Sequence, residues 1–213
     1  MGIKSIVFDC GGVLLRNGDV SPYRRWEGRL GLDEGALERH LWMGDLWRQA
    51  ERGAITDVAF WRRAAEGLGL ADGADADRLR AEIWETWEID PRVLALVDRA
   101  RERYRVAMLT NATDAMEELL AERYGVADRF EAIVNSARVG VAKPDAAIYE
   151  ELLRRLSLEA GEVVFIDDRA ENVAAAASLG MHVAWFLGAA ELERQLEPYL
   201  NPGAAQAREA AED

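Results

Sequence analysis

The chain has 213 residues, half of them apolar and 31% charged, a globular composition with room for one large domain or a core with a small insert. Its 26 basic residues face 39 acidic ones, and the net charge of −13 argues against charge-driven binding to nucleic acid or to anionic membranes. Because Cys10 is the single cysteine and no apolar run could span a bilayer, we expect neither a disulfide nor a membrane segment, and a cytoplasmic setting.

The first predicted element is a buried strand. Residues 3–8 are β-branched, apolar or aromatic in most positions, and the run stops at Asp9-Cys10-Gly11-Gly12, which predicts a turn. Residues 16–88 show helical rather than strand patterns, so we predict an inserted helical segment. Its expected parts are four helices and a loop: helices at 22–30, 33–51 and 56–68, a loop at 71–77, and a helix ending near Trp87.

Tryptophan is concentrated in this insert. Six of the seven tryptophans lie there: Trp26, Trp42, Trp47, Trp61, Trp84 and Trp87. Two interpretations are open, since large aromatic side chains build the core of a small bundle but also line ligand pockets. The sequence favours the bundle core and leaves a pocket role for one or two of them.

From residue 90 onward, helix and strand patterns alternate. Asp90-Pro91 predicts a helix start, and further helices are expected at 115–124, 145–156 and 170–179. Strands are expected at 105–110, 132–135, 162–166 and 182–186. Such alternation predicts an α/β fold with a Rossmann-like parallel sheet, in which ligands bind beyond the carboxyl ends of the strands. The expected division is a core of residues 1–15 and 89–200, the helical insert 16–88, and a disordered tail 201–213.

Asp9 stands directly after the first strand and before two glycines. A carboxylate there suits a nucleophile or a metal ligand, although aspartate before glycine is also common turn chemistry. Because the other predicted strands also end in polar residues, their ends are candidates for one shared site.

Five residues near those ends could complete the site. Thr110 and Asn111 could donate hydrogen bonds to an anionic oxygen, or could merely cap the next helix. Lys143 could supply a fixed positive charge, or could be an ordinary solvated lysine. Asp167 and Asp168 could hold a hard divalent cation through oxygen, or could begin a helix. Their joint placement favours the functional interpretation.

Four further residues are open to a functional or an ordinary interpretation. Cys10 follows Asp9, but without a nearby histidine in the sequence we expect it to pack beneath the turn. Arg16 could reach a substrate anion or stay in water. His40 fits a surface or bundle position better than the site, and His182 lies in no recognisable metal or triad spacing.

Taken together, the motifs resemble those of the haloacid dehalogenase-like hydrolase superfamily, whose commonest members are magnesium-dependent phosphatases. They occur in the expected order as residues 6–14, 109–111, 143–149 and 165–180. The insert is similar in position to the family's four-helix C1 cap. Residues 51–55 and Phe60, with the opening motif, resemble a branch that includes sugar-1-phosphate phosphatases, so the implied substrate is a small phosphomonoester, with a sugar phosphate as one candidate.

The resemblance implies a role for each site residue. Asp9 would attack phosphorus and form an aspartyl phosphate, and Thr110, Asn111 and Lys143 would bind the phosphate, with Lys143 also catalytic. Mg²⁺ would be held by Asp9, the Gly11 carbonyl, Asp167 and Asp168. A cation is needed physically, because two like unit charges about 4 Å apart repel by about 4 kcal/mol at an effective dielectric constant near 20.

Gly11 departs from the family pattern, in which most phosphatases carry an aspartate two residues after the nucleophile. That aspartate protonates the leaving group, and such an acid contributes about 10²- to 10⁴-fold in rate. Its absence keeps two alternatives open. One is a metal-independent 2-haloacid dehalogenase, because a halide leaves without a proton. The other is a binding or regulatory protein with weak or no turnover.

Overall fold

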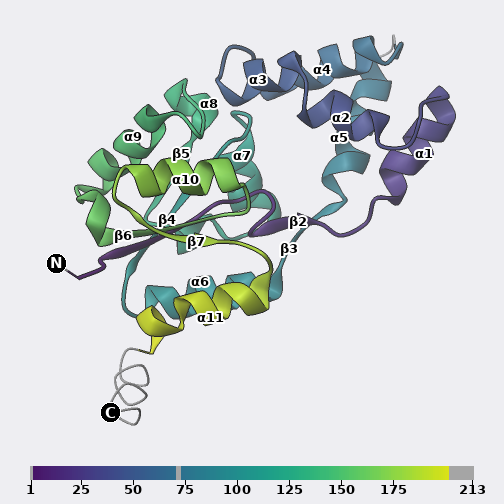
Figure 1. The fold of residues 1–213 in the computed structure, drawn as a ribbon. Helices are drawn as coiled ribbons and strands as arrows, with labels where there is room; N and C mark the ends of the chain where they lie inside the picture. The colour runs from purple at the N-terminus through teal and green to yellow at the C-terminus, as the bar shows by residue number, and fades with distance from the viewer. Residues whose placement is uncertain (1, 71–72, 202–213) are drawn as a thin grey trace.

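The core of the protein is a parallel sheet. The computed structural model describes residues 2–70 and 73–201 (Figure 1). Five strands, all parallel to their neighbours, follow the order β5-β4-β1-β6-β7. They are β1 (Ser5–Phe8), β4 (Arg105–Thr110), β5 (Ala132–Asn135), β6 (Val163–Asp167) and β7 (His182–Trp185). The predicted α/β class and the five predicted strands are confirmed.

Helices cover both faces of this sheet (Figure 1). One face carries α6 (Pro91–Arg101) and α11 (Ala189–Leu200), and the other carries α9 (Ala146–Leu156) and α10 (Ala170–Ser178). Successive side chains of β1 alternate between these layers, as the strand period of two requires. Val7 packs with residues of α9, whereas Ile6 and Phe8 pack with residues of α6 and α11. Each face of the sheet therefore has its own apolar core.

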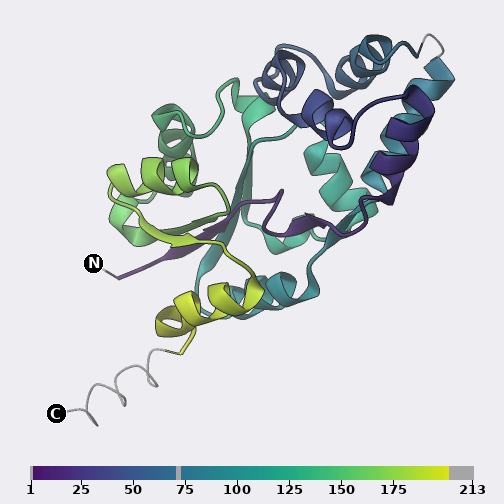
Figure 2. The ribbon, with the colours of Figure 1, turned by 45° about the vertical axis from the view of Figure 1, so that its right-hand side comes forward.

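The inserted segment consists of helices set beside the sheet. They are α1 (Ser21–Leu30), α2 (Ala36–Trp42), α3 (Asp45–Glu51), α4 (Asp57–Gly67) and α5 (Gly73–Trp84). The chain leaves the core through β2 (Leu15–Asn17) and returns through β3 (Trp87–Ile89), and these strands pair antiparallel. Figures 1 and 2 both show α1 to α5 gathered on one side of the core. The paired strands thus connect the two parts at a single double-stranded neck.

Two local predictions for the insert were wrong. The helix expected at 33–51 is two helices, because Gly44 adopts an extended conformation (φ −95°, ψ 175°) between α2 and α3. Residues 73–77 of the expected loop belong to α5, where Ala76, Leu79 and Ile83 are buried at helical spacing, while 71–72 lie outside the described residues. The helix expected to end near Trp87 is α5, which ends at Trp84, and Trp87 itself begins β3.

The predicted helices of the core are present, with local differences. The helix expected at 115–124 begins as α7 (Met116–Glu118) and widens into a π-helical segment, Leu119–Arg123. Shorter elements were not predicted: α8 (Ser136–Val139) and two 3₁₀ turns, Ala127–Arg129 and Ala160–Glu162. Asn201 ends α11, and the rest of the expected tail, 202–213, lies outside the described residues.

Across residues 2–70 and 73–201, every helix falls short of the length and apolarity that a bilayer crossing requires.

Candidate active site

The strand ends meet at one cavity. Phe8 is in register with Met108 of β4 and with Ile166 of β6, so the residues that follow these three positions reach the same edge of the sheet. A cavity of about 320 Å³ lies there, between the sheet and the helices of the insert. Six of the seven predicted site residues line it: Asp9, Gly11, Thr110, Asn111, Lys143 and Asp168. Asp167 does not line it, because it is completely buried.

Lys143 is the electrostatic centre of the site. Its Nζ lies 2.7 Å from Asp9 Oδ1 and 2.7 Å from Asp167 Oδ2, and it donates a hydrogen bond to the Leu109 carbonyl at 2.9 Å. Burial alone would lower the pKa of Lys143, but Asp9 and Asp167 together hold it above its ordinary value. The alternative of an ordinary solvated lysine is therefore wrong, since only 5% of Lys143 is exposed.

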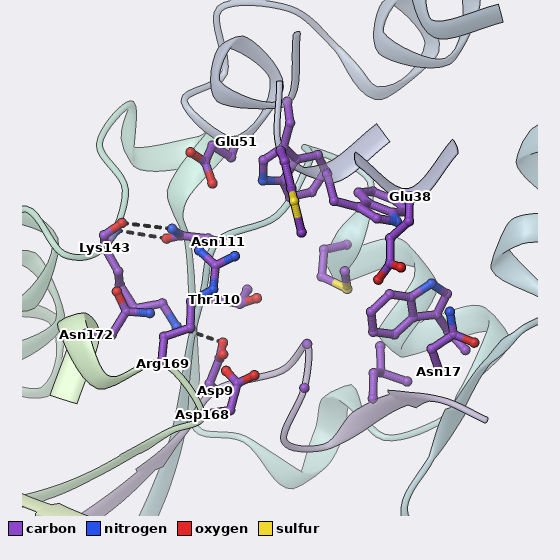
Figure 3. Close-up of a pocket in the computed structure, with 18 of the residues that line it drawn as sticks. Asp9, Asn17, Glu38, Glu51, Thr110, Asn111, Lys143, Asp168, Arg169 and Asn172 are labelled. Atoms are coloured by element: carbon purple, nitrogen blue, oxygen red, sulfur yellow. Dashed lines mark hydrogen bonds and ion pairs between the residues drawn. The ribbon is translucent and has the colours of Figure 1, made fainter. Parts of the chain in front are cut away.

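Asp9 is held by one of its two carboxylate oxygens. Oδ1 accepts a hydrogen bond from the Cys10 backbone N–H at 2.7 Å and contacts the Lys143 ammonium, while Oδ2 has no hydrogen-bond partner among the described residues. Burial raises the pKa of Asp9 to about 7; Lys143 opposes this rise, and Asp167 adds to it. Figure 3 shows Asp9 at the floor of the cavity beside Asp168.

Asp167 and Asp168 are adjacent in sequence but differ in their surroundings. Asp167 Oδ1 accepts hydrogen bonds from the Arg169 N–H at 2.9 Å and from Asn172 Nδ2 at 3.0 Å, and its Oδ2 contacts Lys143. The carboxylate of Asp168 accepts no hydrogen bond from another described residue, and burial, with Asp167, raises its pKa. Asp167 therefore orients its neighbours, whereas Asp168 offers free oxygens to the cavity.

The carboxylates fit a hard divalent cation. Asp9, Asp167 and Asp168 each place an oxygen within 4.8 Å of the other two. Three carboxylates surround one ammonium, so two negative charges are in excess if all are ionised, and oxygen donors are the ligands that Mg²⁺ prefers. The chemistry of the donor set therefore agrees with a magnesium ion.

The turn after Asp9 brings the backbone close to Asp168. Gly12 has φ +86°, and a Cβ atom built there would lie 2.3 Å from Asp168 Oδ2. Gly11 is different, since its φ is ordinary and a Cβ would meet nothing within 4 Å. A side chain at position 11 would therefore fit sterically, whereas one at position 12 would displace a carboxylate of the site.

Asn111 and Thr110 follow β4. Asn111 accepts a hydrogen bond from the Lys143 N–H at 2.9 Å and donates one to the Lys143 carbonyl at 3.0 Å, as the dashed lines in Figure 3 show. This pair fixes the backbone of Lys143. Thr110 is buried at the cavity wall, where its hydroxyl is available to a ligand.

The side of the cavity formed by the insert is mainly apolar. Its described lining includes four tryptophans and two aliphatic or thioether side chains: Trp42, Trp47, Trp84, Trp87, Leu15 and Met43. Sequence analysis left a pocket role open for one or two tryptophans, and four line the cavity. Carboxylates of Glu38 and Glu51 lie on the same side, and burial raises the pKa of Glu51 against the opposing charges of Arg52 and Arg169.

The four residues with open interpretations lie away from the cavity. Cys10 is fully buried, its Sγ lies 3.9 Å from Met116 Sδ, and burial raises the pKa of its thiol. Arg16 lies 3.8 Å from Asp90 and over the ring of Phe186. His40 Nε2 lies 2.9 Å from the Ala64 carbonyl, between α2 and α4. His182 is exposed on β7. None of the four lines the cavity.

Sequence reasoning missed several lining residues. Asn172 stood in a motif but had no assigned role, although it holds Asp167 and lines the cavity. Glu51 stood in the 51–55 motif, also without an assigned role, and Arg169, Asn17 and Glu38 gave no signal as site residues, although all four line the cavity. Asn17, Glu38 and Glu51 belong to the insert side, whose sequence pattern does not reveal which face meets the core.

The comparisons with known proteins agree with this geometry. A family model described as haloacid dehalogenase-like hydrolase matches residues 3–180, and the chain belongs to this family of hydrolases. The sesquiterpene phosphatase astK of Aspergillus oryzae is 29% identical over 179 residues, which are 84% of this chain and 87% of that protein. Three other curated relatives are longer proteins, and the chain spans 17% to 36% of their length.

Two solved structures show the same fold. The HAD family enzyme BT-2542 of Bacteroides thetaiotaomicron, in complex with magnesium and inorganic phosphate, has a TM-score of 0.70 and 26% identity over 86% of this chain and 94% of its own. The 2-haloacid dehalogenase of Pseudomonas syringae has a TM-score of 0.57 and 25% identity over 86% of each chain. An enzyme that binds magnesium and inorganic phosphate and a 2-haloacid dehalogenase thus share this architecture.

Proposed function

We propose that the protein is a Mg²⁺-dependent phosphatase that hydrolyses a small phosphomonoester through a phosphoaspartate at Asp9. The observation that carries the proposal is the cluster of Asp9, Asp167 and Asp168 beside Lys143 at the floor of the cavity. Residues 16–88 would act as a cap over the core formed by residues 1–15 and 89–200. The phosphatase astK and the magnesium and phosphate complex of BT-2542 support this choice.

Asp9 supplies the nucleophile. Since Oδ1 is held by Cys10 and Lys143, the free Oδ2 is the oxygen that attacks phosphorus. The bond between Oδ2 and phosphorus forms as the bond between phosphorus and the leaving oxygen breaks. Water then attacks the phosphorus of the acyl phosphate, which releases inorganic phosphate and restores the Asp9 carboxylate.

The other residues bind and neutralise the phosphoryl group. Lys143 places a fixed positive charge beside Asp9, and Asn111 holds its backbone in place. Thr110 offers a hydroxyl to a phosphate oxygen. Asp9, Asp168, the Gly11 carbonyl and, at the deepest position, Asp167 are the proposed magnesium ligands. When bound, Mg²⁺ would offset the charge of the phosphate and of the carboxylates.

Position 11 has room for the side chain of a general acid, but glycine supplies none, so this position cannot protonate the departing oxygen. We infer that turnover is slow, or that water or the substrate itself supplies the proton. A phosphomonoester with a good leaving group, such as a sugar 1-phosphate, would depend least on this acid, because its alkoxide needs less protonation.

The decisive experiment measures phosphate release from p-nitrophenyl phosphate with and without Mg²⁺, for the wild type and Asp9→Asn. We expect Mg²⁺-dependent release by the wild type and none above the blank by the variant. Equal release by both proteins would remove Asp9 from the mechanism.

Two further arms separate the alternatives. A 2-chloropropionate assay without metal should give no chloride, and robust release would favour the dehalogenase. Gly11→Asp should raise kcat for an alkyl ester such as benzyl phosphate, whose alkoxide needs protonation, by about 10²- to 10⁴-fold, since it restores a general acid where a side chain has room. A silent wild type beside an active Gly11→Asp would indicate a binding protein.

A further inference from the structure

The residues on the insert side of the cavity would contact the alcohol part of the substrate, so their chemistry bears on which alcohol is accepted. The phosphate-binding groups come from the end of β4 and from the loop before α9, both on the core side, so whatever the phosphate esterifies must extend toward the insert (Figure 3). The inference below therefore rests on the proposed function and concerns the same cavity.

The tryptophans on that side form a packed wall. The ring centroid of Trp42 lies 5.0 Å from that of Trp47 and 6.2 Å from that of Trp87, both in edge-to-face arrangements. The Trp42 ring also stacks on Phe60, with 6.1 Å between the centroids. Its indole nitrogen donates to the Tyr23 hydroxyl at 3.0 Å, so that donor is already used. Such mutually packed rings present a fixed apolar surface to a ligand.

Hydrogen-bond donors that could serve a sugar are scarce on this wall. Among the described residues that line it, Asn17 has the one amide, the indole nitrogens of Trp84 and Trp87 are buried away from the surface, and the carboxylates Glu38 and Glu51 can only accept when ionised. A sugar brings several hydroxyl groups, and each hydroxyl that leaves water without a partner costs binding free energy.

The carboxylates also act against a second negative charge. Glu38, which is exposed, and Glu51, which is half-buried, line the space that the esterified group would fill, and like charges repel. Arg169 also lines the cavity and opposes the charge of Glu51, so two carboxylates against one guanidinium leave an excess of negative charge. Phosphomonoesters with a carboxylate or a second phosphate on the insert side would be disfavoured.

We propose that the cavity selects a phosphomonoester of a compact, uncharged and largely apolar alcohol. The volume of about 320 Å³ is at the small end of ligand pockets, so it suits one phosphate with a small ring or branched chain. Apolar contact with Trp42, Trp47 and Met43 provides the selectivity.

The test compares three phosphates of primary alcohols, benzyl phosphate, glucose 6-phosphate and phosphoglycolate, with Mg²⁺ present. All three leave through a primary alkoxide, so differences in leaving-group chemistry are small. We expect kcat/KM for benzyl phosphate to exceed that for each of the others at least ten-fold. Equal or better turnover of glucose 6-phosphate or phosphoglycolate would overturn the inference and leave the proposed function intact.

Two matched variants test whether contact with the cavity wall causes the substrate preference. Met43 and Val58 are both exposed apolar residues of the insert, and only Met43 lines the cavity. Met43→Ser should lower kcat/KM for benzyl phosphate about three-fold or more, with glucose 6-phosphate changed less than two-fold, because apolar contact is removed. Val58→Ser should change neither. Equal effects of Met43→Ser on both substrates would contradict the proposed contact.

A binding measurement tests the same selectivity even if the protein does not turn over these esters. Calorimetric titration of the Asp9→Asn variant with the same three esters reports the preference of the cavity independently of catalysis. We expect at least ten-fold tighter binding of benzyl phosphate than of glucose 6-phosphate. The reverse order would overturn the inference even if no phosphate were released.

Discussion

At the residue scale, the two glycines after Asp9 have different physical requirements. Gly12 combines a left-handed φ of +86° with close approach to the Asp168 carboxylate, so both backbone conformation and space demand glycine. Gly11 has neither constraint. The position that departs from the family pattern is therefore the one where the structure would accept a side chain.

Gly12→Ala should lower the affinity for Mg²⁺ at least ten-fold, because the added methyl group would displace Asp168. Isothermal titration with MgCl₂ measures this. Gly140→Ala is the matched control, since Gly140 has φ +85° and nothing within 4 Å of a Cβ. Both variants should lose about 1 to 2 kcal/mol of stability from the left-handed backbone. Unchanged Mg²⁺ affinity in Gly12→Ala would contradict the proposed role of Asp168.

At the element scale, α4 is joined to the loop after β4 by buried polar contacts. The Thr113 hydroxyl donates to Asp57 Oδ1 at 2.8 Å, and the Asp57 N–H donates to Asp114 Oδ1 at 2.7 Å. Arg80 of α5 lies 2.8 Å from the other oxygen of Asp57. The same loop begins with Asn111, which fixes the backbone of Lys143. Residues 111–114 therefore contact both the proposed phosphate site and helix α4 of the insert.

Thr113→Val should lower the free energy of unfolding by about 1.5 to 3 kcal/mol, since it removes a buried hydrogen bond to a charged group. Urea unfolding of Thr113→Val, Asp57→Asn and the double variant measures the effect and its coupling. We expect non-additive losses, with an interaction energy of about 0.5 to 3 kcal/mol for residues in contact. Additive losses would mean that the two side chains do not act together.

At the scale of the whole molecule, ion pairs tie separate parts of the sheet together. Arg105 at the start of β4 donates to both oxygens of Glu131, at 2.7 and 2.5 Å, just before β5. The hydrogen bonds from Arg105 hold the pKa of Glu131 below its ordinary value. The folded protein therefore resists protonation of Glu131 more than the unfolded chain does.

Because the pKa of Glu131 is lowered on folding, its contribution to stability decreases on acidification. The stabilisation by Glu131 is present above the pKa of this residue in the unfolded chain, which is about 4.3. It is lost as the pH falls through the lower pKa that Glu131 has in the folded protein. Glu131→Gln should therefore cost stability at pH 7, by at most about 1 kcal/mol for so exposed a pair, and the difference from the wild type should shrink as the pH falls below the unfolded pKa. Thermal unfolding across this range measures it. A difference that grows on acidification would contradict the assignment.

The sequence by itself determined the parallel sheet and the residues at its carboxyl edge. Strand-like runs end at Asp9, Thr110 and Asp167, and parallel strands bring their carboxyl ends to one edge, so their meeting could be predicted from local patterns. The identity of the family followed from the order of those motifs.

Only the tertiary structure decided the shape of the insert and the character of the cavity. A helical pattern does not state which face will meet the core, so the tryptophan wall and the carboxylates of Glu38 and Glu51 were not visible in it. The break at Gly44 lay inside an otherwise continuous helical pattern. The contact between Asp57 and Thr113 joins residues 56 positions apart, and packing between distant segments, rather than local preference, sets such contacts.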